Sequence, residues 1–322
     1  MLKVAVLDDY QRRAREFADW DSLGEDVEVV FFHEPIAPDD LAATLDGYQV
    51  LVLMRERTVF RRAVLERLEH LELLITTGMG NASVDIAYLV DRGVVVSGTG
   101  MAGGSSTPGL PSTVEVAWAL ILATSKRVTI EDRAIRAGAW QLDFPFNLAG
   151  ATLGLAGLGR LGAAMVAPAR AFGMEVIAWS QNLTAERAAE VGVRQVSKTE
   201  LLSGSDVLSV HLVLSDRTRG LFGAADLALM KSSAVLVNTS RGPIVDEPAL
   251  IAALRSGTIA AAGLDVFDVE PLPPDDALCS LDNAVLLPHL GYVSEPGFRV
   301  MYEQVVEDIA AFVRGLPIRV LG

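Results

Sequence analysis

Short runs of branched apolar residues alternate with amphipathic stretches along almost the whole chain. Five strand candidates precede residue 100 and six follow residue 150. Between them apolar residues recur at helical spacing, for example over 38–45, 60–68 and 160–172. Strands that alternate with helices are typical of parallel sheets covered on both faces. The pattern therefore predicts an α/β protein with two doubly wound parallel sheets.

The strand candidates share β-branched or apolar runs of five to eight residues. They are KVAVL (3–7), VEVVFF (27–32), YQVLVLM (48–54), LELLIT (71–76), GVVVS (93–97), ATLGLAG (151–157), MEVIAW (174–179), SDVLSVHL (205–212), AVLVN (234–238), AAGLDVF (261–267) and NAVLLP (283–288).

A segment dense in Gly, Ser, Thr and Pro, residues 97–112, separates the two series. Its composition fits a surface loop or a hinge between domains equally well. A long apolar helix follows, with Ser112 or Thr113 as its N-cap, and extends to Lys126 or beyond. The tail over 296–313 is helical again.

Composition narrows the class of protein. The 322 residues are 51% hydrophobic and carry a formal charge of −14, with a mean hydropathy of +0.35. The most apolar helical stretch, 114–123, is too short to span a bilayer, and no basic and apolar leader opens the chain. The acidic balance argues against nucleic acids and anionic membranes as partners. We therefore expect a soluble, cytoplasmic protein whose anionic ligands depend on local arginines.

Cys279 is the sole cysteine. A single cysteine excludes an intramolecular disulfide and a cysteine-rich metal site, and it fits a reducing compartment. We expect no metal.

A glycine-rich turn, Gly157-Leu158-Gly159-Arg160-Leu161-Gly162, matches the G-x-G-x-x-G pattern. The pattern alone is weak, but here a predicted strand precedes it and a predicted helix follows. In that setting the first glycine permits a tight turn, the second lets a pyrophosphate approach and the third lets helix and strand pack closely. The segment predicts dinucleotide binding; the alternative is a glycine turn that only packs tightly.

The end of the next strand bears on which dinucleotide binds. An Asp or Glu there would accept hydrogen bonds from the ribose of NAD and repel a 2′-phosphate. Ser180, Gln181 and Asn182 occupy this place. They can donate hydrogen bonds to a phosphate, and Arg160 and Arg187 are nearby basic candidates. The sequence favours NADP, or use of both cofactors, without excluding NAD.

Three later strand ends carry residues suited to acid–base chemistry. Arg241 follows one strand, Glu270 the next and His289 the last. An arginine can bind a carboxylate in two places, and a histidine can exchange a hydroxyl proton. A carboxylate beside the histidine orients its ring. Each residue alone could be an ordinary turn or surface residue, but all three at strand ends of one sheet predict oxidation of an α-hydroxy acid or reduction of an α-keto acid.

These motifs resemble the D-isomer-specific 2-hydroxyacid dehydrogenases over nearly the whole chain. The likeness rests on GLAGLGRLG, on the segment from DVLSVHL to NTSRG, on GLDVFDVEP and on LPHLGY. It implies that Arg241, Glu270 and His289 are catalytic. It also implies a cofactor site that contains the glycine turn and Asp265, to which we add Thr239 and, in place of the usual acid, Ser180, Gln181 and Asn182. His211, on a predicted strand, is either structural or faces the cofactor.

The resemblance also implies how the chain is divided. A dinucleotide-binding Rossmann domain (103–292) would be inserted into a flavodoxin-like substrate domain (1–102 and 293–322). In the substrate domain, Gly78, Met79 and Gly80 match a loop whose N–H groups hold the substrate carboxylate, and Arg55 stands at a strand end. An exposed turn position for Arg55 is an equally good interpretation. The family usually forms a homodimer through the cofactor domain.

The expected activity is transfer of a hydride between NAD(P)H and a small 2-keto acid, with glyoxylate and hydroxypyruvate as first candidates. A D-3-phosphoglycerate dehydrogenase and a non-catalytic NAD(H)-binding corepressor are the alternatives. Glu270 argues against a formate dehydrogenase, which has an amide there. The chain departs from the family pattern at Val213, where proline is common, at Ser180, and in the length of the 97–112 segment.

Overall fold

The computed structural model describes residues 1–100 and 110–322 and divides the chain into two compact units. Unit 1 comprises Met1–Pro108 and Ser294–Gly322, and unit 2 comprises Gly109–Val293. The domain boundaries predicted from the sequence are 102/103 and 292/293. The first of those positions lies outside the described residues. Each unit is an α/β structure built on a parallel sheet, as the hydrophobic pattern predicts.

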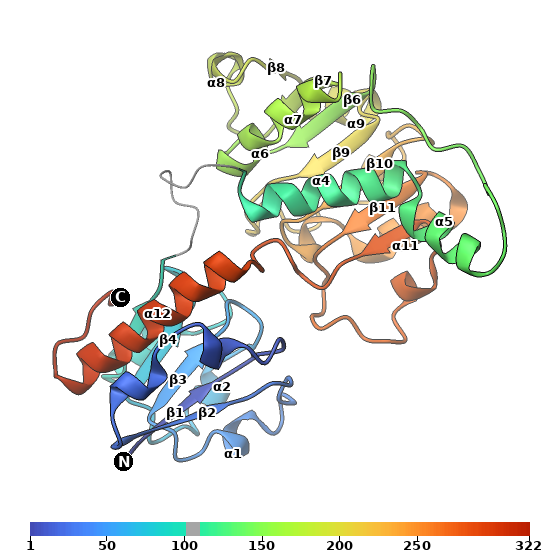
Figure 1. Cartoon of the computed structure of the whole chain (residues 1–322). Coiled ribbons are helices and arrows are strands. Elements are labelled where there is room, and N and C mark those ends of the chain that lie inside the picture. The colour runs from blue at the N-terminus through green and yellow to red at the C-terminus, as the bar shows by residue number, and fades with distance from the viewer. Residues whose placement is uncertain (101–109) are drawn as a thin grey trace. The chain divides into compact units, whose positions relative to one another are not determined.

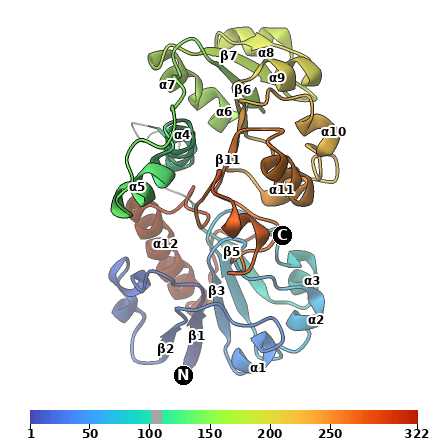
Figure 2. The same ribbon diagram turned by 90° about the vertical axis from the view of Figure 1, so that its right-hand side faces the viewer.

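Unit 1 has five parallel strands in the order β2-β1-β3-β4-β5, which is the flavodoxin-like order. Its strands are nearly all apolar because helices cover both faces. Figure 2 shows β1, β2, β3 and β5 in the lower half of the view, with α12 on the left. The elements are β1 (Leu2–Val6), β2 (Val27–Phe31), β3 (Val50–Leu53), β4 (Leu73–Thr76), β5 (Val95–Gly98), α1 (Leu41–Thr44), α2 (Arg62–Leu65), α3 (Ile86–Asp91) and α12 (Glu295–Val313), with short 3-10 turns at Ala14–Glu16 and Trp20–Leu23.

Unit 2 has seven parallel strands in the order β12-β11-β10-β9-β6-β7-β8. The order reverses between β6 and β9, as in a Rossmann fold. Its strands are β6 (Thr152–Ala156), β7 (Glu175–Trp179), β8 (Arg194–Gln195), β9 (Val207–Val210), β10 (Val235–Asn238), β11 (Ala261–Leu264) and β12 (Ala284–Leu286). Its helices are α4 (Ser112–Ser125), α5 (Val128–Arg136), α6 (Arg160–Ala164), α7 (Val166–Ala171), α8 (Ala185–Glu190), α9 (Lys198–Gly204), α10 (Ala224–Leu227) and α11 (Glu247–Ser256), with 3-10 turns at Gly242–Ile244 and Ala277–Ser280.

All eleven predicted strands are present, and β8 is an addition. Its two residues are exposed and polar at the sheet edge, so no apolar run announces it. Asp246 caps α11 through a bond from the Ala249 N–H (2.9 Å), and Gly257 ends that helix in a left-handed conformation, both as expected.

Two details of the predicted helices are wrong. Helix α4 begins at Ser112 with Pro111 as N-cap, and neither predicted side chain caps it. The Thr113 hydroxyl instead donates to the Gly291 carbonyl (2.7 Å). The helix predicted over 160–172 is divided into α6 and α7 at Met165. Pro168 explains the break, because it has no N–H to donate to the carbonyl four residues earlier.

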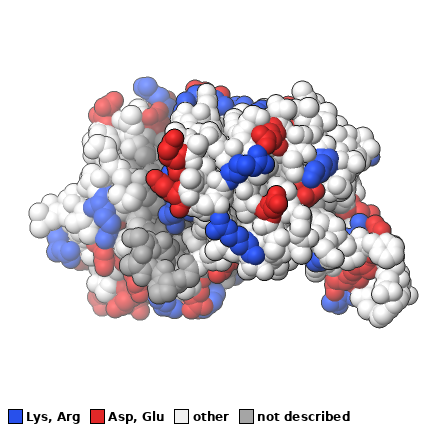
Figure 3. Space-filling model, turned by 90° about the horizontal axis from the view of Figure 1, so that it is seen from above, with Lys and Arg blue, Asp and Glu red and all other residues white. Residues whose placement is uncertain are grey.

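Helix α4 packs along β10, β11 and β12, where it buries Leu120 and Ile121 (Figure 1). No helix within residues 1–100 and 110–322 is long and apolar enough to cross a membrane. On the face seen in Figure 3, basic and acidic side chains alternate.

A buried carboxyl in α12 makes the stability of unit 1 depend on pH. Asp308 accepts a bond from Nε of Arg319 (3.0 Å), but burial outweighs this partner and raises its pKa from 3.8 to about 7. A folded pKa above the unfolded value means that protonation favours the folded state. The free energy of unfolding should therefore fall as pH rises from about 4 to about 7. Above about pH 7 the contribution of Asp308 should no longer change with pH.

Asp308→Asn keeps the acceptor oxygen and removes the titration. We expect the variant to lose part of the decline in stability between pH 4 and 7, which urea unfolding at several pH values would measure. Glu303→Gln, an exposed site on the same helix, is the control. Equal pH slopes for Asp308→Asn and wild type would show that this carboxyl does not titrate in that range.

Candidate active site

One edge of the unit 2 sheet gathers the predicted site residues. Parallel strands end at the same edge, so residues that follow different strands come together there. The glycine turn follows β6, Ser180 follows β7, His211 follows β9, Thr239 and Arg241 follow β10, Asp265 and Glu270 follow β11, and His289 follows β12. All the unit 2 candidates therefore lie at this edge.

The glycine turn is closed tightly against the neighbouring strand end. A Cβ on Gly157, whose φ is +104°, would lie 2.3 Å from the His211 carbonyl oxygen. A Cβ on Gly162 would lie 2.1 Å from the Gly157 carbonyl oxygen. Both distances exclude a side chain. The position of a Cβ on Gly159 is different, because no heavy atom lies within 4 Å of it. The turn is thus closely packed at Gly157 and Gly162 and open at Gly159.

Two buried polar atoms beside this turn fit a dinucleotide. Nδ1 of His211 and Oγ1 of Thr239 are buried, and neither has a hydrogen-bond partner within the described residues. Nε2 of His211 lies 2.9 Å from Oγ of Ser209. Burial lowers the pKa of His211 to about 4, so its ring is neutral at neutral pH and has one donor and one acceptor nitrogen. Buried polar groups need partners, and a bound ligand would provide them.

The end of β7 carries no carboxylate. Ser180 is half-buried, and Gln181 and Asn182 are exposed. Arg160 is solvent-exposed at the first position of α6, whereas Arg187 forms an ion pair with Glu190 on α8. Of these two basic candidates, Arg187 is therefore already paired with an acid, and Arg160 is exposed.

His289 and Glu270 form a close pair. Nδ1 of His289 lies 2.6 Å from Oε2 of Glu270, and both side chains are mostly buried. The other oxygen of Glu270 accepts the Phe267 N–H (2.9 Å), which fixes the carboxylate. The backbone of His289 is left-handed (φ 53°), and the edge of Tyr292 packs against its ring at 5.2 Å between centroids. Because Nδ1 contacts Glu270, Nε2 is the ring nitrogen that could exchange a proton with a ligand.

Asp265 fixes the loop that carries the histidine. Its two oxygens accept the N–H groups of Leu290 (2.6 Å) and Gly291 (2.8 Å), the residues that follow His289. The side chain is buried, and this burial raises its pKa to about 6 against the opposing effect of the two hydrogen bonds. The Asp265 side chain thus fixes the main chain that follows His289, and Glu270 orients the imidazole ring.

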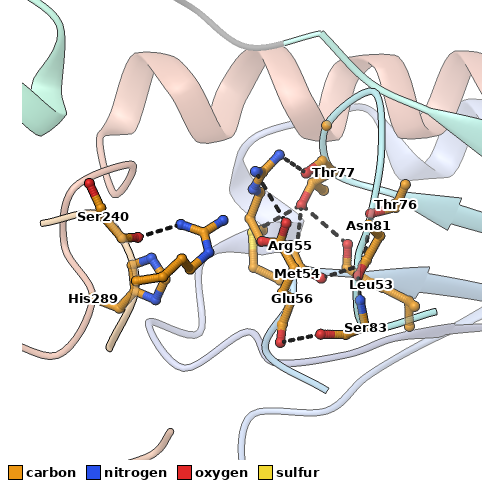
Figure 4. Close-up of polar contacts among 12 residues, drawn as sticks. Leu53, Met54, Arg55, Glu56, Thr76, Thr77, Asn81, Ser83, Ser240 and His289 are labelled. Carbon is orange, nitrogen blue, oxygen red and sulfur yellow. Dashed lines mark hydrogen bonds and ion pairs between the residues drawn. The ribbon is translucent and has the colours of Figure 1, made fainter. Parts of the chain in front are cut away.

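Arg241 is held close to the Glu270 loop by the backbone. A Cβ on Gly242 would lie 2.1 Å from the Phe267 carbonyl carbon, so the β10 and β11 loops touch here. Asn238 stabilises the turn by donating to the Arg241 carbonyl (2.9 Å). Nη1 of Arg241 donates to the Ser240 carbonyl (2.7 Å), the dashed line beside Ser240 in Figure 4. The backbone at Arg241 is thus fixed, and one of the five N–H donors of its guanidinium bonds the Ser240 carbonyl.

The unit 1 candidates follow adjacent strands of the other sheet. Arg55 comes after β3, and Gly78, Met79 and Gly80 come after β4. Figure 4 shows Arg55 fastened to Thr77, which precedes that loop. Arg55 is thus a structured, mostly buried residue (20% exposed side chain) and not a freely exposed turn arginine.

The residues that position the candidates were not predicted from the sequence. Thr77 and Asn81 hold Arg55, Glu56 pairs with it, and Tyr292 packs on His289. Polar residues in loops carry no periodic signal, so only the fold reveals these contacts. Among the described residues, no group of three or more His, Cys, Asp and Glu side chains could hold a metal ion.

Comparison with known proteins identifies the family. Residues 118–291, more than half of the chain, match the model of the D-isomer specific 2-hydroxyacid dehydrogenase NAD binding domain. A glyoxylate reductase of Korarchaeum cryptofilum is 38% identical over 260 residues, which cover 78% of this chain and 76% of that protein. A D-3-phosphoglycerate dehydrogenase of Archaeoglobus fulgidus is 32% identical over 99% of this chain, which spans only 58% of that relative.

A solved structure agrees along the whole chain. The crystal structure of a putative D-3-phosphoglycerate dehydrogenase from Ralstonia solanacearum has a TM-score of 0.90 and 35% identity, and the match covers 99% of this chain and 96% of that one. The fold class and the enzyme class predicted from the motifs are confirmed, and an NAD-binding domain is identified. The chain belongs to the D-isomer-specific 2-hydroxyacid dehydrogenase family.

Proposed function

We propose that this enzyme reduces a small 2-keto acid such as glyoxylate or hydroxypyruvate to the D-2-hydroxy acid. The observation that carries the proposal is the 2.6 Å contact between His289 and Glu270. It places an oriented imidazole at the same sheet edge as Arg241 and the glycine turn. Together they supply a carboxylate anchor, a proton donor and a cofactor site, which is the minimum set for this reaction.

Each residue would have one role. Arg241 binds the substrate carboxylate and polarises the carbonyl. His289 donates the proton from Nε2 to the carbonyl oxygen, and Glu270 holds the ring by Nδ1. The bound nicotinamide supplies the hydride at its C4. From the resemblance we also assign the Met79 and Gly80 N–H groups, and Arg55, to binding of the substrate. The third candidate of this loop, the Gly78 N–H, already donates to Oγ1 of Thr99 (3.1 Å).

The same residues would hold the dinucleotide. We assign the pyrophosphate to the turn from Gly157 to Gly162, in front of Gly159, where the space is open. His211, Thr239 and Asp265 are cofactor-side residues in this proposal, the first two through their unpartnered buried atoms.

The direct test is a panel of keto acids assayed with NADPH and NADH in parallel. The panel contains glyoxylate, hydroxypyruvate, pyruvate and 3-phosphohydroxypyruvate. We expect oxidation of the reduced cofactor with at least one unphosphorylated acid. Dinucleotide binding without turnover on any of them would favour the corepressor alternative, which would not need the Arg/Glu/His set.

We further propose that NADP is the preferred cofactor. Ser180, Gln181 and Asn182 place no negative charge at the end of β7, and Arg160 is exposed nearby. A 2′-phosphate would therefore meet hydrogen-bond donors and no like charge.

Ser180→Asp should shift the ratio of kcat/KM values for NADPH and NADH toward NADH by about 10-fold or more, because an acid at the strand end repels the 2′-phosphate and binds the ribose hydroxyls. Ser203→Asp adds the same charge on exposed positions of α9 and should leave the ratio unchanged. An unchanged ratio in Ser180→Asp would remove these residues from cofactor selection.

We also propose a homodimer formed through unit 2. The segment between α5 and β6, residues 137–151, runs as an extended loop along the outside of this unit (Figure 1). Trp140, Leu142 and Phe144 are 73%, 53% and 95% exposed on it. The loop is nevertheless fixed, because Glu131 accepts the Leu142 N–H (3.2 Å) and Lys126 donates to the Phe146 carbonyl (2.7 Å). A fixed, exposed apolar surface is typical of a protein interface.

A cytoplasmic location stays a prediction from the sequence.

Phe144→Asp should convert the dimer to a monomer, because it places a charge in the proposed apolar interface. Light scattering after size exclusion would measure the mass. Val213→Asp, also at a strongly exposed apolar position (83%), is the control and should remain dimeric. A wild-type protein that is monomeric at micromolar concentration would contradict the proposal.

A further inference from the structure

We propose that Glu56 makes the Arg55 position accept singly charged keto acids and discriminate against phosphorylated ones. The proposal rests on the proposed function and decides between two substrate classes that the family includes. Its basis is the set of contacts around Arg55 at the carboxyl edge of the unit 1 sheet, drawn in Figure 4.

Arg55 has no freedom to adjust to different ligands. Its backbone is left-handed (φ 53°), an unfavourable conformation for arginine. Its N–H donates to Oγ1 of Thr77 (2.8 Å), and its carbonyl accepts from Nδ2 of Asn81 (2.6 Å). Asn81 also donates to Oγ1 of Thr76 (3.0 Å), so two strand ends hold the residue. The surroundings thus impose a conformation that the residue would not adopt alone.

The guanidinium is fixed against the loop that we assign to the substrate carboxylate. Its Nη1 donates to the Thr77 carbonyl (3.0 Å). A Cβ on Gly78 would lie 1.8 Å from the same Nη1, and the φ of Gly78 is +122°. Only glycine therefore lets the arginine lie over this loop. The Gly78 N–H itself donates to Oγ1 of Thr99 (3.1 Å), so a ligand held by the Met79 and Gly80 N–H groups would be next to the arginine.

Glu56 cancels the charge of this arginine. Its Oε1 lies 3.6 Å from Nη2 of Arg55, and both side chains are only 20% exposed. Its backbone is fixed too, because Ser83 donates to the Glu56 carbonyl (3.3 Å). In a site shielded from water, the pair offers N–H donors with almost no net charge.

The rest of this sheet edge supplies no compensating positive charge. The segments that follow the five strands (7–14, 32–40, 54–61, 77–85 and 99–111) contain five arginines and seven acidic residues. The other four arginines are already engaged: Arg12 with Glu34, Arg13 with Glu16, Arg57 with the Asp8 carbonyl and the Tyr10 ring, and Arg61 with the Ala82 carbonyl.

The two substrate classes differ in the charge that they bring to this edge. A keto acid such as hydroxypyruvate carries one negative charge. A phosphorylated keto acid adds between one and two further charges. Next to Glu56 those charges would meet a carboxylate as well as a guanidinium, and like charges that are poorly solvated repel strongly. Glu56 is therefore the specificity-determining residue in this proposal.

The test compares kcat/KM for hydroxypyruvate and 3-phosphohydroxypyruvate in wild type and Glu56→Gln. Wild type should prefer hydroxypyruvate. Glutamine keeps the shape and removes the charge, so the ratio of phosphorylated to unphosphorylated substrate should rise on the order of 10- to 100-fold. The change should lie mainly in the KM of the phosphorylated acid, which a general structural defect would not produce.

Glu34→Gln removes an exposed acid from the same edge and should leave both parameters unchanged. A wild type that prefers 3-phosphohydroxypyruvate, or a Glu56→Gln variant with an unchanged ratio, would overturn the inference while the dehydrogenase assignment stands. Absence of turnover on every keto acid would instead overturn the proposed function and this inference together.

Discussion

His289→Ala should lower kcat by about 10²- to 10⁴-fold, because the substrate oxygen loses its positioned proton donor. The imidazole is fixed by Glu270 at 2.6 Å and by the Asp265 bonds to Leu290 and Gly291. Alanine leaves those backbone bonds possible, so dinucleotide affinity, measured by titration of protein fluorescence, should change much less than turnover.

His70→Ala is the matched control, because this histidine is exposed in unit 1 and should be dispensable for turnover. Turnover close to wild type in His289→Ala would exclude the imidazole as the acid. Equal losses of turnover and cofactor affinity would instead indicate a structural role for His289.

Arg241→Gln should reduce kcat/KM by about 30- to 3000-fold, the range for removal of one partner of a desolvated charge pair. Both KM and kcat should change, since the guanidinium anchors the carboxylate and polarises the reacting carbonyl. The turn itself should persist, because Asn238 and Gly242 act through the backbone.

Arg217→Gln, an exposed arginine in the loop after β9, is the comparison and should retain wild-type kinetics. Arg241→Lys is informative as well, because lysine keeps the charge but cannot bind a carboxylate in two places. If Arg241→Gln retained the wild-type KM, another group would have to hold the carboxylate.

The fold was predictable because its signals are local. Each buried parallel strand is a continuous apolar run, and Asp246 and Gly257 mark the ends of α11 by well-defined cap chemistry. Errors arose where a local signal was outweighed by its surroundings. Thr113 looks like a cap, but its hydroxyl bonds the Gly291 carbonyl, a residue 178 positions away.

The site was predictable only in part for the same reason. Arg241, Glu270 and His289 could be recognised by their places after strands, and the order of the strands brings those places to one edge. The contacts that fix these residues could not be predicted from the sequence. The closeness of Gly242 to Phe267 depends on how two loops pack, which no spacing in the sequence encodes. In the sequence Glu56 is an ordinary loop carboxylate, and only the structure shows that its side chain pairs with Arg55.

The most direct test of the proposed reaction follows the hydride itself. Hydroxypyruvate would be reduced with NADPH or NADH in which both C4 hydrogens are deuterium, and the product examined by chiral chromatography and mass spectrometry. We predict the D-hydroxy acid with one deuterium at C2, and loss of this product in His289→Ala. A product of the L configuration, or one without deuterium, would contradict direct hydride transfer in a D-2-hydroxyacid dehydrogenase.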